Sequence, residues 1–248
     1  MKRVAIIGLC LFITLIGLNF NLKAGENSAL RFAIGEKLEY SLWFNFIRGG
    51  EATMEIIGLE RVNGQPAYHL RLVSETSPIF DKIFKVRDYF DSWMDIRGLF
   101  SHQFQKNIQE GRYRKKYAVR FDYDQQKAFT SNDTVAIKGH MQDALSVIYC
   151  VRAENLSEGR IIKLNNFDNN KIKLFNVVVS RTEKISVPAG EFECFVLEPY
   201  ATEGKLFKYQ TDMTIYVSTD SLRLPVLITS TANFGKMVFK LERRSIKF

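Results

Sequence analysis

Three histidines are the side chains best suited to metal binding or acid-base catalysis, and none of them has a partner at a recognised spacing. His69, His102 and His140 stand too far apart for a metal-ligand motif, and the sequence contains no HExxH or CxxC pattern. His69 and His102 fall on expected strand faces that point away from the apolar alternation, so we interpret them as surface histidines. The sequence therefore predicts no metal site and no catalytic histidine.

A nucleophile and a carboxylate pair are the other candidates for chemistry. Ser146 precedes Cys150 by one helical turn, but there is no GxSxG motif, so we interpret Ser146 as a helix residue. Asp88 and Asp91 are of the residue type that forms the paired acids of a glycosidase. Residues i and i+3 of a strand point to opposite faces, so these acids converge only if a bulge intervenes, and a solvated strand edge explains them better. We expect no catalytic residue and no cofactor site.

A basic run, RYRKKYAVR over residues 112–120, interleaves cations with aromatic side chains. Such a run could contact a phosphate headgroup or a polyanion. Strand alternation explains it more simply, because Arg114 and Lys116 fall opposite Tyr113, Lys115 and Tyr117. We therefore expect a half-exposed strand whose charges protect a sheet edge.

The elements that must position these residues are mostly strands. Apolar residues alternate with polar ones over 38–46, and again over 52–56 and 68–72. Arg48-Gly49-Gly50 and Asn63-Gly64 supply the expected turns. The segment SPIFDKIF, 77–84, has the spacing of a short helix, and strand patterns resume over 86–94, 101–108 and 117–123.

The second half of the chain begins with a helix. Asp143 is expected to cap a helix that ends near Arg152, where apolar residues share neighbouring turns. Six further strands are predicted, over 160–167, 171–187, 191–199, 213–218, 225–232 and 236–243. The fold class expected is mainly β, with an antiparallel curved sheet or a barrel-like arrangement and one or two short helices. No repeat or Pro/Ser-rich linker divides the chain, which favours a single β-rich domain.

The first residues have the pattern of a secretory signal peptide. Lys2 and Arg3 precede an apolar run over 4–18 that is shorter than the ~20 residues of a spanning helix. We expect cleavage after Ala24, which leaves residues 25–248 as the envelope domain. A retained N-terminal anchor is the alternative, and Leu9 before Cys10 is too large for a lipobox.

Composition limits the partners of the mature protein. Loss of residues 1–24 removes three cations and no acid, so the formal net charge of +8 falls by three to +5. This mild positive charge allows weak attraction to anionic lipid headgroups or to acidic polysaccharide, but no nucleic-acid motif accompanies it. Only Cys150 and Cys194 remain after cleavage, and either a disulfide or two separate thiols fits an oxidising compartment.

Several segments together resemble a known family. GEKLEYSLWFNFIRGGEATMEI, RDYFDSWMDIRGLFSHQF, DALSVIYCVR, VPAGEFECFVLEP and STDSLRLPVLITSTANFGKMVFKL occur in the order found in the bacterial domain-of-unknown-function 3108 family. The resemblance extends from about Phe32 to Leu241. It implies an exported envelope protein with an antiparallel β fold and no established chemistry. It transfers no catalytic or cofactor residue, and Gly35, Tyr40, Gly50, Asp143 and Gly190 are interpreted as structural.

Export, β patterning and an aromatic content of 13% favour a non-enzymatic binding module. A curved sheet of this size can enclose an apolar cavity for one hydrophobic or amphipathic ligand, such as a lipid. The alternative is an assembly protein that pairs with another envelope protein through a sheet edge. A glycan-active hydrolase ranks last. We expect the protein to lie in the periplasm or outer envelope, with no nucleic-acid partner and peripheral membrane contact at most.

Overall fold

One antiparallel sheet forms the body of the protein. The computed structural model describes residues 30–201, 211–232 and 235–246. The strands of the first half are β1 (Glu36–Phe44), β2 (Ile47–Val62), β3 (Gln65–Thr76), β4 (Arg87–Asp95), β5 (Ser101–Glu110), β6 (Tyr113–Asp122), β7 (Lys127–Thr130) and β8 (Thr134–Ala136). Those of the second half are β9 (Ile161–Asp168), β10 (Lys171–Val187), β11 (Gly190–Ala201), β12 (Thr211–Ser218), β13 (Pro225–Ala232) and β14 (Gly235–Ile246).

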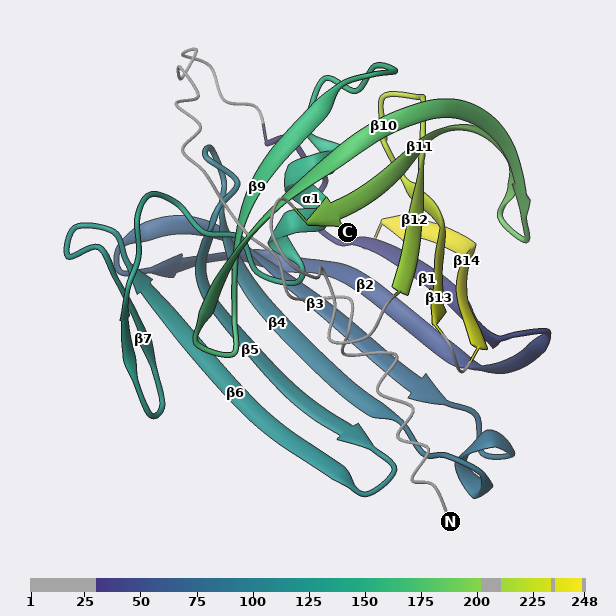
Figure 1. Ribbon diagram of the computed structural model, residues 1–248, viewed down its shortest axis with the longest axis horizontal. Helices are drawn as coiled ribbons and strands as arrows, with labels where there is room; N and C mark the ends of the chain where they lie inside the picture. The colour runs from purple at the N-terminus through teal and green to yellow at the C-terminus, as the bar shows by residue number, and fades with distance from the viewer. Residues whose placement is uncertain (1–29, 202–210, 233–234, 247–248) are drawn as a thin grey trace.

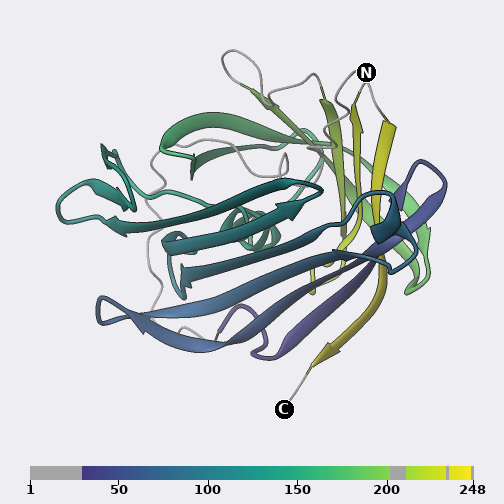
Figure 2. The same cartoon turned by 90° about the horizontal axis from the view of Figure 1, so that it is seen from below.

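The strand order explains how the two halves join. The 14 strands follow the order β8-β7-β6-β5-β4-β3-β2-β1-β14-β13-β12-β11-β10-β9, and every neighbouring pair is antiparallel. The first and last described strands, β1 and β14, therefore meet in the middle of the sheet, while β8 and β9 form its two edges. The sheet curls around the helix α1 (Ser146–Arg152), which lies between the halves (Figure 1). Figure 2 shows the same helix surrounded by strands. The predicted curved antiparallel fold is confirmed.

The curled sheet stays open, and contacts other than pairing between its edge strands join its two sides. Lys106, on the inner face of β5, forms an ion pair with Asp168 at the end of β9. Both side chains are buried, with exposed fractions of 2% and 1%. Beyond them, the backbone N–H of Asn170 donates to the Tyr117 hydroxyl of β6 at 3.3 Å. The end of β9 thus lies against the inner face of β5 and β6.

A second set of contacts bridges the same gap through the backbone. The Ser101 amide donates to the carbonyl of Met141 at 2.9 Å, and the Phe167 amide donates to the carbonyl of Gln142 at 2.8 Å. Gln142 also forms a parallel bridge with Asn166 of β9. The segment before α1 therefore links the start of β5 to β9, so the position of the helix depends on both halves of the sheet.

The core lies on the concave face of the sheet, as the alternation predicted. Buried side chains of the first half include Leu38, Met54, Leu70 and Phe104, and they pack with residues of the helical segment. A second apolar cluster fills the space between the other side of α1 and strands β9–β12. Apolar burial on both sides of one short helix supplies the main driving force for the fold.

Most predicted elements are confirmed, and one turn prediction is wrong. The β1–β2 turn lies at Asn45 and Phe46, where Asn45 has φ 54°, and not at 48–50. Asn63-Gly64 forms the predicted tight turn, with φ 52° and 79°. The helix predicted over 77–84 is a short 3-10 helix, η2 (Phe80–Lys82). Strands β7 and β8 were not predicted, because runs of four and three residues are too short to show alternation.

Gly50 lies inside β2, and its importance comes from a close backbone approach. A Cβ atom at this position would lie 2.2 Å from the carbonyl oxygen of Glu75 on β3. We expect Gly50→Ala to lower the free energy of unfolding by about 3 kcal/mol, because the two strands must separate to relieve the overlap. Gly58→Ala is the matched control on the same strand, since no atom lies within 4 Å of its added Cβ. Urea denaturation compares the two, and equal losses would contradict this explanation.

Among residues 30–201, 211–232 and 235–246, no helix has the length and apolar character needed to cross a membrane. The predicted signal peptide, residues 1–24, lies outside the described residues.

Candidate ligand-binding interior

Asp143 fixes the start of α1. One carboxylate oxygen accepts the backbone N–H groups of Leu145 and Ser146 at 2.7 and 3.0 Å. The other accepts the hydroxyl of Ser92 on β4 at 2.6 Å. Complete burial raises the pKa of this carboxyl group. Asp143 therefore accepts the first N–H groups of the helix, as a capping side chain does, although the residue directly before α1 is Leu145, and it also ties the helix to β4.

Arg152 fixes the other end of α1. Its buried guanidinium lies 2.8 Å from Glu36 of β1 and donates to the carbonyls of Leu222 and Arg223 at 3.2 and 3.0 Å. Glu36 also pairs with Arg244 of β14 at 3.1 Å. Because residues at both ends of α1 are bonded to the surrounding strands and loops, the position of the helix inside the curled sheet is fixed.

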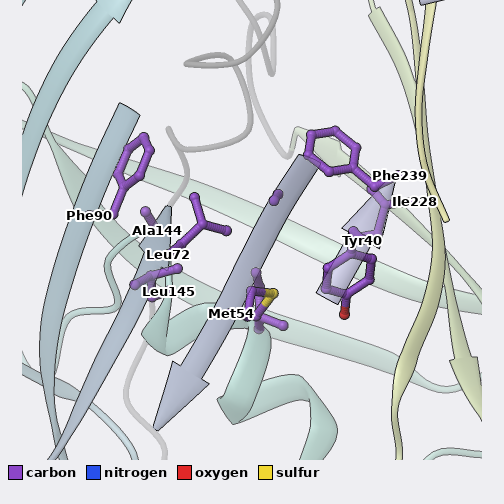
Figure 3. A pocket seen from close by; sticks show the side chains of 10 residues that line it. Tyr40, Met54, Leu72, Phe90, Ala144, Leu145, Ile228 and Phe239 are labelled. Carbon is purple, nitrogen blue, oxygen red and sulfur yellow. The ribbon is translucent and has the colours of Figure 1, made fainter. Parts of the chain in front are cut away.

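The first recess lies between α1 and the first half of the sheet. Its volume is about 30 Å³. Ten side chains line it: Tyr40, Ala52, Met54, Leu72, Phe90, Ala144, Leu145, Ile148, Ile228 and Phe239. Figure 3 shows these side chains converging from the strands and from the helical segment. The hydroxyl of Tyr40 is the polar group among these side chains, and it donates to the carbonyl of Pro225 at 2.8 Å.

The second recess lies on the opposite side of the helix, against β10–β13. Its volume is about 50 Å³. Its lining is also apolar and consists of Val147, Ile148, Val151, Phe175, Val177, Leu197, Pro199, Met213, Ile215, Val217 and Pro225. Ile148 belongs to both recesses. We call the pair the helix-flanking recesses. Apart from the Tyr40 hydroxyl, which is bonded to the Pro225 carbonyl, the linings are apolar, so the recesses interact with a ligand mainly through apolar contact.

A larger and more polar cavity lies at the C-terminal end of α1. Its volume is about 480 Å³. It is lined by Arg31, Phe32, Ala33, Glu36, Arg152, Ala153, Glu154, Ser221, Leu222, Arg223 and Arg244. We call it the arginine mouth, because four arginines outnumber two glutamates. Val151 and Arg152 are consecutive residues of α1, and they line the second recess and the arginine mouth respectively.

The two predicted carboxylates do not converge, which agrees with strand geometry. Asp88 lies on the inner face of β4 and Asp91 on the outer face. The solvated-edge interpretation is wrong for Asp88, because β4 lies between β3 and β5 and this side chain is buried. Its neighbour is Glu110 of β5, which is buried as well. Burial, together with the charge of Glu110, raises the pKa of Asp88 to about 7.

The surface interpretation is also wrong for two histidines. His69 and His102 are 7% and 5% exposed. The two ring nitrogens of His69 lie 2.7 Å from Glu60 and 2.8 Å from Asp91. Hydrogen bonds to these carboxylates, that of Asp91 foremost, raise the pKa of His69 despite its burial. His69 is thereby held on the outer face of the sheet, where it also stacks on Trp93.

The other two histidines lie elsewhere. His102 lies 3.1 Å from Asp95, and His140 is exposed and stacks on the ring of Phe100. In the described part of the chain, no three His, Cys, Asp or Glu residues are grouped to hold a metal ion.

Ser146 and the cysteines have structural surroundings. The hydroxyl of Ser146 accepts the backbone N–H of Asp143 at 2.8 Å, which completes the helix cap. Cys150 and Cys194 are both free, so of the two alternatives left by the sequence the structure shows separate thiols. Burial raises the pKa of each thiol to about 12, which suppresses the reactive thiolate.

The family of this chain follows from a match over most of its length. The family model described as a protein of unknown function (DUF3108) matches residues 38–242. The chain belongs to this family. The description of the DUF3108 family names no activity, and the recognition made from the sequence is confirmed. A comparison with curated proteins found no significant match.

One solved structure shares the β-barrel-like architecture of this chain. The crystal structure of a β-barrel-like protein of domain of unknown function DUF1849 from Brucella abortus is 11% identical, with a TM-score of 0.55, and the match covers 87% of this chain and 99% of that one. A candidate lipoprotein from Parabacteroides distasonis is 9% identical, with a TM-score of 0.37 and coverage of 89% and 100%. A candidate exported protein with a YmcC-like fold from Bacteroides fragilis is 11% identical, with a TM-score of 0.31 and coverage of 86% and 96%.

Proposed function

We propose that the protein is a non-enzymatic binding module that holds one hydrophobic or amphipathic molecule alongside α1. The observation that carries this proposal is the apolar lining of the two helix-flanking recesses. A polar ligand would lose its hydrogen bonds to water there without replacement, whereas an alkyl chain would lose none. The polar hydroxyl in the first recess, that of Tyr40, is already bonded to the backbone.

The size of the recesses limits the shape of the ligand. Volumes of about 30 and 50 Å³ are well below the roughly 150 Å³ of an apolar cavity that binds benzene. Neither recess therefore holds a ring system in this conformation, and a long alkyl chain enters only if the lining side chains move apart. Ile148 lines both recesses, so an alkyl chain in either position would contact this side chain.

The arginine mouth supplies the polar end of the proposed site. Its four arginines, against two glutamates, favour an anionic head group, and guanidinium groups match carboxylate and phosphate geometry. Its volume of about 480 Å³ suits such a group. We therefore propose an anionic amphiphile, for example a fatty acid or a phospholipid. The signal-peptide pattern of residues 1–24 supports a site of action in the cell envelope.

Native mass spectrometry of protein purified without denaturation tests this function. We expect a bound mass that disappears on organic extraction and returns when the extracted protein is mixed with oleate. Ile148→Trp, which fills both recesses, should lower oleate affinity by at least about tenfold, equivalent to about 1.4 kcal/mol. Ile57→Trp is the control, because Ile57 is exposed on β2.

Circular dichroism would establish that both variants are folded, since overpacking of a core position costs about 1–3 kcal/mol. A bare monomer mass together with no saturable oleate binding would contradict the proposal.

Assembly through a sheet edge is the second candidate function. The β6–β7 register begins at Val119, so the first half of β6 borders only β5 within the described sheet. This agrees with the edge expected from the basic run. The cations of this segment disfavour pairing with another strand, which places ligand binding first. Cross-linking in intact cells would distinguish a strand partner from a bound small molecule.

A further inference from the structure

Large apolar side chains project from the loops at one end of the sheet. Phe46, in the β1–β2 turn, is 85% exposed. Ile79 and Ile83, on either side of η2 in the β3–β4 connection, are 79% and 76% exposed. Single exposed apolar residues are common on proteins, but three side chains this exposed on neighbouring loops indicate a surface for interaction.

Hydrogen bonds show that three connections and the start of β14 meet at this end. The Ser77 amide donates to the carbonyl of Gly49 at 2.9 Å, and the Gly111 amide donates to that of Lys85 at 2.8 Å. The Asn45 amide donates to the carbonyl of Lys236 at 2.7 Å. We call this group the loop end and define it as residues 45–49, 77–85, 111–114 and 235–236. The β1–β2 and β3–β4 connections lie at the right of Figure 1.

The loop end is strongly cationic. Its four segments contain six cations, Arg48, Lys82, Lys85, Arg112, Arg114 and Lys236, and one acid, Asp81. Asp81 is paired with Arg87 of β4 at 2.6 Å, and Arg48 is paired with Glu51 at 3.1 Å. The turns at the opposite end, 63–64, 96–100 and 123–126, contain one cation and one acid. Positive charge is therefore concentrated where the apolar side chains project.

We propose that the loop end docks the protein on an anionic membrane surface, with Phe46, Ile79 and Ile83 entering the interfacial region and the cations contacting phosphate groups. Apolar side chains flanked by lysines and arginines are the pattern of interfacial anchors. The exposed aromatic ring of Tyr113 in the same group suits the headgroup level. A protein partner would have to match both an excess of cations and separated apolar projections. The proposal does not require a ligand in the interior.

The charge contribution is tested with the full chain and two kinds of vesicle. We expect the protein to float with vesicles of equal parts phosphatidylcholine and phosphatidylglycerol, and to remain in solution with phosphatidylcholine alone. A cation near an anionic surface contributes about fivefold in affinity, so reversing two charges in Lys82→Glu/Lys85→Glu should weaken binding at least about tenfold. Lys127→Glu/Lys138→Glu, at exposed positions outside the loop end, should bind like the unchanged protein.

The apolar contribution is tested in the same assay. Phe46→Ser/Ile79→Ser/Ile83→Ser should also weaken binding at least about tenfold, without loss of fold because these side chains are exposed. Ile57→Ser/Leu59→Ser is the matched control at exposed apolar positions of β2. No binding to the anionic vesicles, or equal binding by the variants and their controls, would overturn the proposal. Self-association or a protein cross-link through the loop end without vesicle binding would overturn it too.

The two tryptophans report the orientation of docking. Trp43 lies at the end of β1 beside the loop end, whereas Trp93 lies near the opposite end of β4. Brominated phosphatidylglycerol should quench Trp43 fluorescence in Trp93→Phe, and it should leave Trp93 unquenched in Trp43→Phe. Equal quenching would overturn the proposed orientation. Vesicle binding by extracted protein would uphold docking even if no ligand mass were found, so the two proposals fail separately.

Discussion

Replacing Asp168 by alanine is expected to lower the free energy of unfolding by about 3–5 kcal/mol, because the change leaves the Lys106 ammonium buried without its partner. This ion pair joins β5 to the end of β9, two strands that do not pair with each other in the open sheet. The loss is a large part of the stability of a typical protein, about 5–15 kcal/mol. Urea denaturation followed by circular dichroism measures it.

Two further variants separate the loss of a pair from the exposure of a charge. Lys106→Met/Asp168→Leu removes both charges at similar volume and should recover most of the stability. Glu183→Ala breaks the exposed pair between Glu183 and Arg181 and should cost less than about 1 kcal/mol. If Asp168→Ala lowers the free energy of unfolding as little as Glu183→Ala does, the buried pair does not stabilise the contact between β5 and β9.

The strands were predictable because their signal is local. In β1 and β2, inward and outward side chains alternate along the chain, and this pattern does not depend on which strand is the neighbour. The turn at 48–50 was misplaced because glycine has two uses. Gly50 is needed because the Glu75 carbonyl approaches it closely, and this approach cannot be predicted without knowing that β3 pairs with β2 at this register. Asn45, at positive φ, provides the actual turn.

Burial of polar side chains was less predictable, because it depends on neighbours from other strands. His69 does lie on the outer face that the alternation indicated, but Trp93 stacks on it at 4.7 Å and Glu60 and Asp91 surround its ring. Lys106 carried a usable signal. It occupies an inward position between Phe104 and Ile108, and a lysine at such a position requires a buried acid.

The candidate site was predictable in character but not in place. The aromatic content indicated an apolar interior, yet the helix-flanking recesses combine side chains from β1–β4, α1 and β10–β14. The arginine mouth joins residues near 31, 152, 222 and 244. The spacing within one segment cannot predict such a group, because its residues come together only when strands β9–β14 fold back beside β1. Asp143 was an exception, since a helix cap is a local feature.

At alkaline pH, the Asp88→Asn variant is expected to be more stable than the unchanged protein. Burial, and then the charge of Glu110, raises the pKa of Asp88 to about 7, so the folded protein favours the neutral acid. A raised folded-state pKa contributes stability that is fully present below the unfolded pKa of about 4 and is lost as pH rises through 7. Between pH 5 and pH 8 this single group should lower the stability of the unchanged protein by about 3 kcal/mol.

Asparagine has nearly the same shape as aspartate and cannot ionise. Its side-chain carbonyl can still accept the backbone N–H of Gln109, which donates to Asp88 at 2.9 Å in the unchanged protein. The expected result is a gap in stability between variant and unchanged protein that widens from pH 5 to pH 8, measured by urea denaturation. Asp124→Asn, at an exposed turn, should open no such gap. His69 also loses stabilising energy as pH rises through its raised pKa, but it is present in every protein compared, so its effect cancels. A gap of constant size would show that Asp88 is ionised in the fold at both pH values, and that its burial beside Glu110 does not hold the proton.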